Sequence, residues 1–178
     1  TGMTLKGAND YRPEDFCIDA PNNTFSAVYG PEGDGDIMHP QAAVSMKEAM
    51  GGAHLAHLCV GDGGFDFAGR EEVQEQLILP LLATQMATGL RCLCEGGTMM
   101  QKLYTVHLPV TARLLHLVGS CFEEFTLIKP LTSRPSNSEQ YFVAKRRRGG
   151  IEAALDLIDD IARSLYMGTQ PRLMSPLP

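Results

Sequence analysis

Apolar residues recur every three to four positions in two stretches of the chain, which is the spacing of one face of an α-helix. One stretch covers residues 70–94, and Gly96-Gly97 follows it as a typical helix C-cap. We expect Pro80 to kink this helix or to split it in two. The other stretch covers residues 151–165. End signals predict two further helices, over residues 41–50 and 109–121.

Short apolar runs between these segments predict β-strands over residues 53–61, 98–103, 125–129 and 140–145. The last two are joined by about ten residues, too few for a crossover helix, so we expect them to pair antiparallel. Strands alternating with helices predict an α/β fold, with a mainly parallel sheet and helices on both faces, made mixed by the antiparallel strand. Residues 1–5 look like the end of another strand, whereas residues 6–39, rich in Gly, Pro, Asn and Asp, are predicted to be loops.

Length and composition place the chain among globular proteins. Its 178 residues fit one domain with a real core, and 44% hydrophobic with 20% charged residues is ordinary for that class. The apolar stretches are too short or too interrupted to span a bilayer, and no signal-peptide pattern opens the chain. The five cysteines are odd in number, so we expect reduced, mostly buried thiols. Cys92-x-Cys94 lacks a second ligand pair, so no metal site is expected.

The charge is distributed unevenly along the chain. A formal net charge of −6 argues against a protein held on nucleic acid by bulk electrostatics. The run Lys145–Arg148 nevertheless concentrates four cations. Two interpretations are open for this run: a local contact with phosphate, or a solvated charged linker before the last helix.

Three charged residues stand at the ends of predicted strands. Asp62 follows the strand that ends at Gly61, Lys102 ends the apolar run from residue 98, and Glu139 precedes the last strand. In such sheets, ligands bind outside the carboxyl ends of the strands. Together these residues can orient one hydroxyl for attack on an electrophile, provided that burial or another cation lowers the pKa of the lysine. The alternative is a structural salt bridge.

A second candidate is the loop segment Asp34-Gly35-Asp36-Ile37. The carboxylate of an aspartate here can accept hydrogen bonds from a ribose hydroxyl or from an adenine amino group. The alternative interpretation is an acidic glycine turn that binds nothing.

Several motifs occur in a fixed order along the chain. They are Gly2-Met3-Thr4-Leu5-Lys6-Gly7, Asp34-Gly35-Asp36-Ile37, Asp62-Gly63-Gly64-Phe65, Gln74-Glu75, Gly96-Gly97, Lys102, Lys129-Pro130-Leu131-Thr132-Ser133-Arg134-Pro135 and Asn137-Ser138-Glu139-x-Tyr141. Together they resemble the eukaryotic cap-specific mRNA 2′-O-methyltransferases, with the FtsJ-like branch that methylates the first transcribed nucleotide as the nearest type. The resemblance covers residues 1–145, and its last motif is long and specific.

The resemblance implies a Rossmann-like methyltransferase sheet, mostly parallel with an antiparallel C-terminal strand, that binds S-adenosylmethionine as its cofactor. Asp62, Lys102 and Glu139 match the last three members of the family's Lys-Asp-Lys-Glu tetrad, with Lys102 acting on the ribose 2′-hydroxyl. Asp36 and Ile37, together with Asp62, match the positions that hold the cofactor. The implied reaction uses no metal.

The resemblance also implies that the substrate is capped mRNA, with Glu72, Arg134 and Asn137 near the RNA. Glu72 departs from the Asn that the enzymes acting on the first nucleotide usually carry. Whether the first or the second transcribed nucleotide is modified stays open. The transcription or capping machinery is the candidate partner, in the nucleus or alternatively in the cytoplasm.

The family's first strand, its glycine-rich cofactor loop and the first Lys of the tetrad lie upstream of the segment that matches residues 1–7. We therefore interpret residues 1–148 as the C-terminal part of an FtsJ-like methyltransferase domain, here lacking the first strand, and residues 149–178 as an amphipathic helix and tail. For the isolated chain we expect weak or no binding of S-adenosylmethionine. The alternative function is a catalytically inactive module of the same fold that binds RNA or a protein partner.

Overall fold

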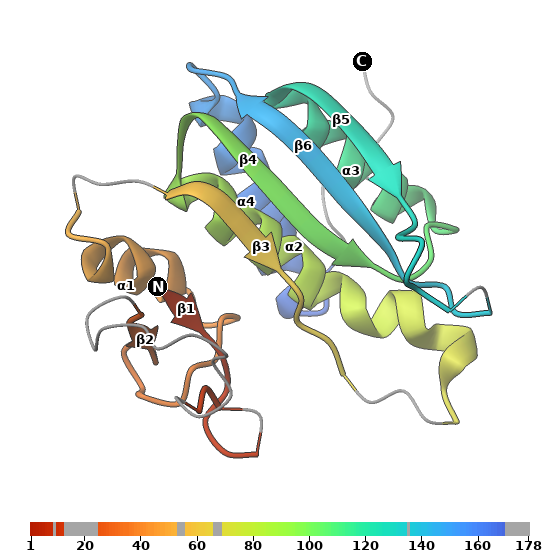
Figure 1. Ribbon diagram of the computed structural model, residues 1–178, viewed down its shortest axis with the longest axis horizontal. Helices are drawn as coiled ribbons and strands as arrows, with labels where there is room; N and C mark the ends of the chain where they lie inside the picture. The colour runs from red at the N-terminus through yellow and green to blue at the C-terminus, as the bar shows by residue number, and fades with distance from the viewer. Residues whose placement is uncertain (9, 13–24, 53–55, 66–68, 135, 170–178) are drawn as a thin grey trace. The chain divides into compact units, whose positions relative to one another are not determined.

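The computed structural model describes residues 1–8, 10–12, 25–52, 56–65, 69–134 and 136–169 (Figure 1). The predictions made for residues 13–24 and 53–55 and for the tail from residue 170 lie outside this described part. The chain forms two compact units, residues 1–55 and 56–178. No helix among the described residues combines the length and the apolar character that crossing a membrane requires.

The first unit contains two short strands and one helix. β1 (Gly2–Met3) pairs in parallel with β2 (Ala27–Val28), which confirms the strand expected at the start of the chain and adds one inside the segment predicted as loops. The predicted helix is α1 (Ala42–Ala49). Gly51 and Gly52, with φ of 82° and 68°, close it as expected, because their N–H groups donate to carbonyls of its last turn at 2.9 and 3.0 Å.

The second unit is built on a four-stranded sheet in the order β3-β4-β6-β5. Its strands are β3 (Ala56–Gly61), β4 (Leu93–Leu103), β5 (Phe122–Ile128) and β6 (Gln140–Arg147). β3 and β4 pair in parallel, whereas β6 pairs antiparallel with both β4 and β5. Three strands therefore point one way and β6 points the other. The mixed sheet and the antiparallel pairing of the last two strands are confirmed.

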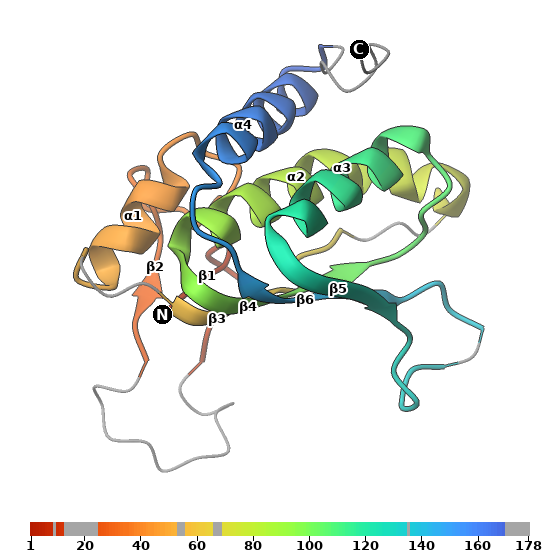
Figure 2. The same cartoon turned by 90° about the horizontal axis from the view of Figure 1, so that it is seen from above.

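The helices α2 (Gln74–Cys92), α3 (Pro109–Ser120) and α4 (Glu152–Tyr166) all lie on one face of this sheet (Figure 2). For the described residues of this unit, the expectation of helices on both faces is therefore wrong. α2 connects β3 to β4 and α3 connects β4 to β5, so both connections cross the sheet in the same direction. Right-handed crossovers that share a direction place their helices on the same side. On the opposite face, Leu58 and Val60 of β3 are 59% and 55% exposed.

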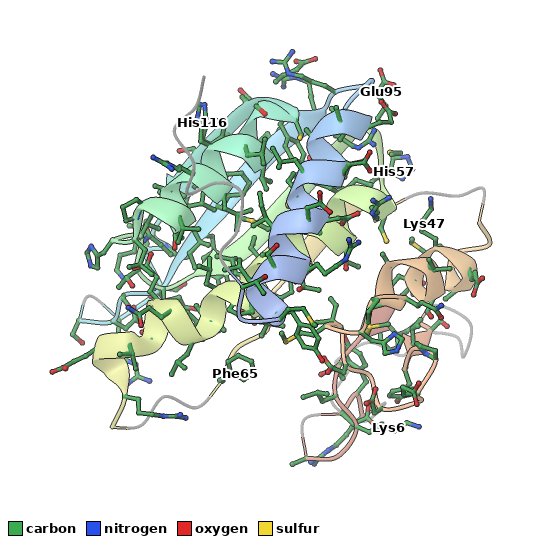
Figure 3. All side chains as sticks on the ribbon, turned by 180° about the vertical axis from the view of Figure 1, so that it is seen from behind. Lys6, Lys47, His57, Phe65, Glu95 and His116 are labelled. Atoms are coloured by element: carbon green, nitrogen blue, oxygen red, sulfur yellow. The ribbon has the colours of Figure 1, made fainter. Side chains whose placement is uncertain are left out.

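The hydrophobic core lies between the sheet and this helix layer (Figure 3). Phe122 and Phe142 from the sheet and Met86 from α2 are among its largest fully buried side chains. α4 contributes the apolar face that the spacing in residues 151–165 predicted. Its buried residues are Leu155, Ile158, Ile161 and Ala162.

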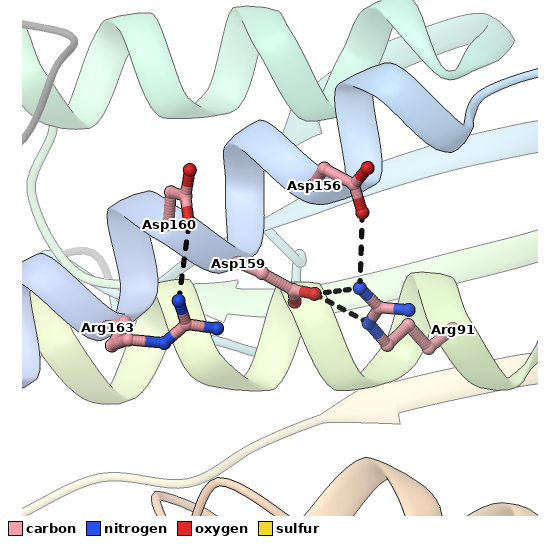
Figure 4. Close-up of polar contacts among 5 residues, drawn as sticks. All are labelled: Arg91, Asp156, Asp159, Asp160 and Arg163. Atoms are coloured by element: carbon pink, nitrogen blue, oxygen red, sulfur yellow. Dashed lines mark hydrogen bonds and ion pairs between the residues drawn. The ribbon is translucent and has the colours of Figure 1, made fainter.

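An ion pair joins α4 to α2 within this layer (Figure 4). The Nε atom of Arg91, near the end of α2, donates to Asp159 at 2.7 Å, and a second N–H group of Arg91 binds the same oxygen. Asp156 lies 3.7 Å from the guanidinium. The Asp159 side chain is 23% exposed, against 81% for Asp156, so the bond to Asp159 is the less screened by water.

α2 follows a 3₁₀ turn, η2 (Glu71–Val73), and runs without a break through Pro80. The expectation that this proline splits the helix is therefore wrong. Pro80 removes one backbone hydrogen bond, but its neighbours Leu79 and Leu81 are buried. Burial of the apolar face contributes more to the stability of the helix than the lost hydrogen bond costs.

The boundary between α2 and β4 also differs from the prediction. The helix ends at Cys92 and the strand begins at Leu93, so Gly96-Gly97 does not cap the helix. Gly96 instead adopts a φ of 80° inside β4, where the pairing with β3 shifts register between Ala56 and Leu58. Such a bulge requires an unusual backbone conformation at one residue, and glycine adopts it without a steric penalty.

Candidate active site

The sheet topology brings Asp62, Lys102 and Glu139 to the same end of the strands. β3 and β4 are parallel, so Asp62, directly after β3, and Lys102, next to last in β4, lie at their shared carboxyl end. β6 runs the other way, and Glu139 directly precedes it. Lys102 is paired in register with Tyr141 of β6.

Lys102 forms an ion pair with Asp62. Its Nζ atom lies 3.1 Å from Oδ1 of Asp62 and 5.6 Å from the centre of the Tyr104 ring. Burial opposes the charge on Lys102, but the hydrogen bond with Asp62 and the electrostatic effects of Tyr104, Asp62 and Glu139 outweigh it and raise the pKa of Lys102 above its ordinary value. The condition that burial or another cation lowers this pKa is not met in this arrangement. Lys102 is therefore an ammonium at neutral pH.

The carboxylate of Glu139 is held through both of its oxygens. The hydroxyl of Tyr141 donates to Oε1 at 2.9 Å, while Ser133 Oγ and Asn137 Nδ2 each lie 3.2 Å from Oε2. The hydrogen bond from Tyr141 is the main reason why the pKa of Glu139 is lowered. Burial, the next largest effect, opposes it, and smaller effects of Ser133, Asn137 and the charge of Lys102 act in the same direction as Tyr141. Glu139 is therefore ionised at neutral pH.

Two glycines allow the turn that carries Asp62 to lie against the amides of the buried Gln101 and the partly buried Gln85. A Cβ atom on Gly61 would come within 2.0 Å of Oε1 of Gln101, and one on Gly63 within 2.0 Å of Nε2 of Gln85. Gln101 donates to Gln85 at 2.8 Å, so β4 and α2 together form the surface on which the turn lies. A side chain at either glycine would displace one of these amides, a close approach that the sequence alone does not reveal.

Glu75, at the start of α2, anchors the loop that follows Lys102. Its buried carboxylate accepts the N–H groups of His107 and Leu108, both at 2.9 Å, and the hydroxyl of Thr105 at 3.2 Å. Burial raises the pKa of Glu75, but the interactions with the Thr111 hydroxyl, with the N–H groups of Leu108 and His107 and with Thr105 outweigh it and lower the pKa below its ordinary value. Our sequence reasoning gave Glu75 no role, although the Gln74-Glu75 motif was a signal.

Asp36 and Ile37, the predicted cofactor residues, lie in the first unit after β2. Asp34 Oδ1 accepts the N–H of Asp36 at 3.0 Å, and Asp36 Oδ1 accepts the N–H of Met38 at 2.9 Å. Gly35 between them has a φ of 80°, and a Cβ atom there would lie 1.8 Å from the carbonyl oxygen of Thr4. The segment is therefore an acidic glycine turn locked against the end of β1, which is compatible with either interpretation.

The predicted RNA-binding residues occupy exposed positions. Glu72 lies in η2, and Arg134 and Asn137 lie in the loop between β5 and β6. Asn137 is also engaged within that loop, because its Oδ1 accepts from Lys129 at 2.9 Å and from Ser133 at 3.0 Å.

The basic run Lys145–Arg148 is not a linker, because β6 extends through Arg147. Lys145 lies 4.0 Å from Glu124 of β5, and Arg146 pairs with Glu123 and, at 3.2 Å, with Glu124. The solvated-linker interpretation is wrong for these strand residues. The pairing also reduces the positive charge that they present to a phosphate.

The described cysteines are all free. Cys92 and Cys121 are buried, and Cys59 and Cys94 are partly buried, as expected for structural thiols; Cys17 lies outside the described residues. Burial, with a smaller effect of Cys92, raises the pKa of Cys59 to about 11, so this thiol stays protonated. Among the described residues, no group of three His, Cys, Asp or Glu side chains is arranged to hold a metal ion.

The chain belongs to the FtsJ-like methyltransferase family, whose sequence pattern matches residues 2–147. This match confirms the resemblance that the motifs indicated. Asp62, Lys102 and Glu139 all lie within the matched residues.

Several similar proteins carry the same name. "Cap-specific mRNA (nucleoside-2'-O-)-methyltransferase 1" of Danio rerio is 41% identical over 159 residues, which cover 85% of this chain and 19% of that protein. The Xenopus laevis and Homo sapiens proteins of the same name are each 37% identical, over 92% and 88% of this chain and 20% and 19% of theirs. The chain thus spans about a fifth of the length of these relatives.

Proposed function

We propose that the chain is part of the catalytic domain of an S-adenosylmethionine-dependent mRNA cap ribose 2′-O-methyltransferase. The reaction transfers a methyl group to the 2′-hydroxyl of a cap-proximal nucleotide of capped mRNA. The observation that carries this proposal is the meeting of Asp62, Lys102 and Glu139 at one end of the sheet, with Lys102 and Asp62 3.1 Å apart. An inactive scaffold needs none of these three residues.

Lys102 acts on the reacting 2′-oxygen. S-Adenosylmethionine, when bound, supplies a methyl group activated by a positively charged sulfur. The hydroxyl proton passes to solvent water as the oxygen bonds to the methyl group. The ammonium of Lys102 stabilises the negative charge that develops on this oxygen, and Asp62 and Glu139 fix the position of the ammonium. With its raised pKa, Lys102 acts here as a cation. A second cation beside it, such as the upstream Lys that the family resemblance implies, would lower this pKa and allow Lys102 to act as a base.

The two aspartates predicted to contact the cofactor, considered separately, each support this proposal. Asp36 uses Oδ1 for its own turn and Asp62 uses Oδ1 for Lys102, and among the described contacts the second oxygen of each carboxylate is left to accept from a ligand. Asp36 and Ile37 would hold the adenosine end, with Asp62 near the reacting end.

On the RNA side, Glu72, Arg134 and Asn137 contact the capped strand. Glu72 is acidic and therefore suits a base edge or a ribose hydroxyl better than a phosphate.

In the same proposal, the sheet is the later part of a Rossmann-like sheet whose first strand lies upstream. Residues 1–148 belong to the methyltransferase domain and residues 149–178 form its C-terminal helix and tail. The protein acts in the nucleus, beside the transcription or capping machinery.

The test uses the protein that contains this chain together with its upstream sequence. Lys102→Ala should lower methyl transfer from S-adenosylmethionine to capped RNA by about 100- to 1,000-fold, because it removes the charge that stabilises the reacting oxygen. Arg163→Ala, which removes a surface ion pair within α4, is the matched control and should leave transfer unchanged. Undiminished transfer by Lys102→Ala would refute the assignment, and no transfer by the unaltered protein would favour the inactive module.

A further inference from the structure

The loop between β5 and β6 is closed by one lysine that the catalytic assignment leaves unused. Lys129 directly follows β5, whose last residue, Ile128, is paired in register with Tyr141. Its Nζ atom donates to the carbonyl of Asn137 at 2.8 Å, to Oδ1 of Asn137 at 2.9 Å and to the carbonyl of Glu139 at 3.1 Å. An ammonium carries three donors, so each of its hydrogens has an acceptor at the far end of the loop.

This contact also sets the orientation of the Asn137 side chain. Lys129 donates to Oδ1 of Asn137, so the amide nitrogen is the atom that turns toward Glu139. That nitrogen donates to Oε2 of Glu139 at 3.2 Å. A carbonyl oxygen in its place would repel the carboxylate. Lys129 therefore acts on Glu139 through the main chain and through the side chain of Asn137.

We propose that Lys129 is a positioning residue, which closes the 129–139 loop and thereby holds the carboxylate of Glu139 beside Lys102. This inference rests on the proposed function, in which Glu139 belongs to the reacting group. The competing role for an exposed lysine next to an RNA site is a direct phosphate contact, which needs only its charge.

The substitution Lys129→Arg distinguishes the positioning role from the phosphate contact. Arginine keeps the positive charge, but its donors lie in a planar fork and cannot converge from one atom on three acceptors as an ammonium does. Lys129→Arg should therefore behave like Lys129→Ala if the lysine positions Glu139, and like the unaltered protein if it contacts phosphate. Lys47→Ala, in α1 of the first unit (Figure 3), is the control for loss of a lysine charge.

The first measurement is kinetic, on the protein extended upstream. Both Lys129 variants should lower kcat by about 10- to 100-fold, because a misplaced reacting group destabilises the transition state. Any rise in the KM for capped RNA that follows from loosening Asn137 should be the same in both variants. Lys47→Ala should match the unaltered protein. If Lys129→Arg keeps kcat, and Lys129→Ala only raises KM, the positioning role is overturned.

The second measurement needs no activity and uses the 178-residue chain. Nuclear magnetic resonance should show the amides of Asn137 and Glu139 becoming mobile in both variants, with backbone order parameters below about 0.6. The titration midpoint of the Glu139 carboxyl should rise. An ordered loop in Lys129→Arg overturns the positioning role whatever the enzyme does. A loosened loop in a protein whose unaltered form transfers no methyl group supports the role of Lys129 and counts against the proposed function.

Discussion

At the scale of single residues, hydrogen bonds and ion pairs determine the ionisation states of the candidate site residues. The sequence predicts Asp62, Lys102 and Glu139 as site residues because each stands at one end of a predicted strand and belongs to a motif. Their ionisation states could not be predicted, because the pKa of Lys102 depends on a carboxylate 3.1 Å away and on partial burial. The spacing of residues along the sequence indicates neither of these. The roles of Lys129 and Tyr141 could not be predicted either, because they depend on contacts formed only in the folded chain.

Tyr141→Phe removes the strongest hydrogen bond to Glu139 while keeping the ring. Because that bond is the main cause of the lowered pKa of Glu139, the pKa should rise toward its ordinary value of 4.5. The ionised carboxylate is lost as pH falls through this pKa, so the acid limb of the pH–rate profile should move to higher pH. Methyl transfer measured as a function of pH checks this. Tyr166→Phe, at the end of α4, is the control; an unmoved acid limb would show that Glu139 is not the titrating group.

At the scale of elements, the helices predicted over residues 109–121 and 151–165 are confirmed, whereas the boundary between the long helix before them and the following strand was wrong. α3 begins at Pro109 and α4 carries its apolar face as expected. The boundary between α2 and β4 was wrong because Gly96 suits a helix cap and a strand bulge equally well. Pairing with β3, a contact distant in sequence, decides between them.

Glu75 joins two elements and should affect stability. Glu75→Gln places an amide where three donors converge, so buried N–H groups lose an acceptor and the free energy of unfolding should fall by about 1–3 kcal/mol. Urea unfolding of the chain at neutral pH measures this. Glu152→Gln, exposed in the first turn of α4, should change it by less than about 0.5 kcal/mol.

The pH dependence of the same variant gives an independent check. Because folding lowers the pKa of Glu75, its contribution to stability is present above the unfolded value, near 4.5, and is lost as pH falls through the lower folded value. The unaltered chain should therefore lose stability in acid below about pH 4.5 more steeply than Glu75→Gln. Equal acid slopes would mean that Glu75 is not ionised in the folded chain.

At the scale of the whole molecule, the α/β class and the mixed sheet followed from the order of elements, whereas the one-sided helix layer did not. The direction in which successive strands are added to a sheet is set by pairing between distant segments. The division into two compact units was likewise not predicted, because the length and composition of the chain suit one domain.

α4 lies beyond the residues that match the family pattern, yet it completes the core of the second unit. Ile158 is fully buried, so Ile158→Ala should lower the free energy of unfolding by about 2–5 kcal/mol through lost burial and the cavity that remains. Chemical denaturation of the chain checks this. Asp156→Ala on the exposed side of the same helix should cost less than about 1 kcal/mol. Equal effects would mean that α4 is not docked.

β3 is an edge strand of the described sheet, and Leu58 and Val60 leave its outer surface apolar. Its sequence, Ala-His-Leu-Cys-Val-Gly, contains no Lys and no Pro, the residues that natural edge strands use to discourage pairing with other chains. A concentrated solution of this chain on its own will tend to aggregate through β3, so light scattering belongs beside every unfolding or titration experiment on it.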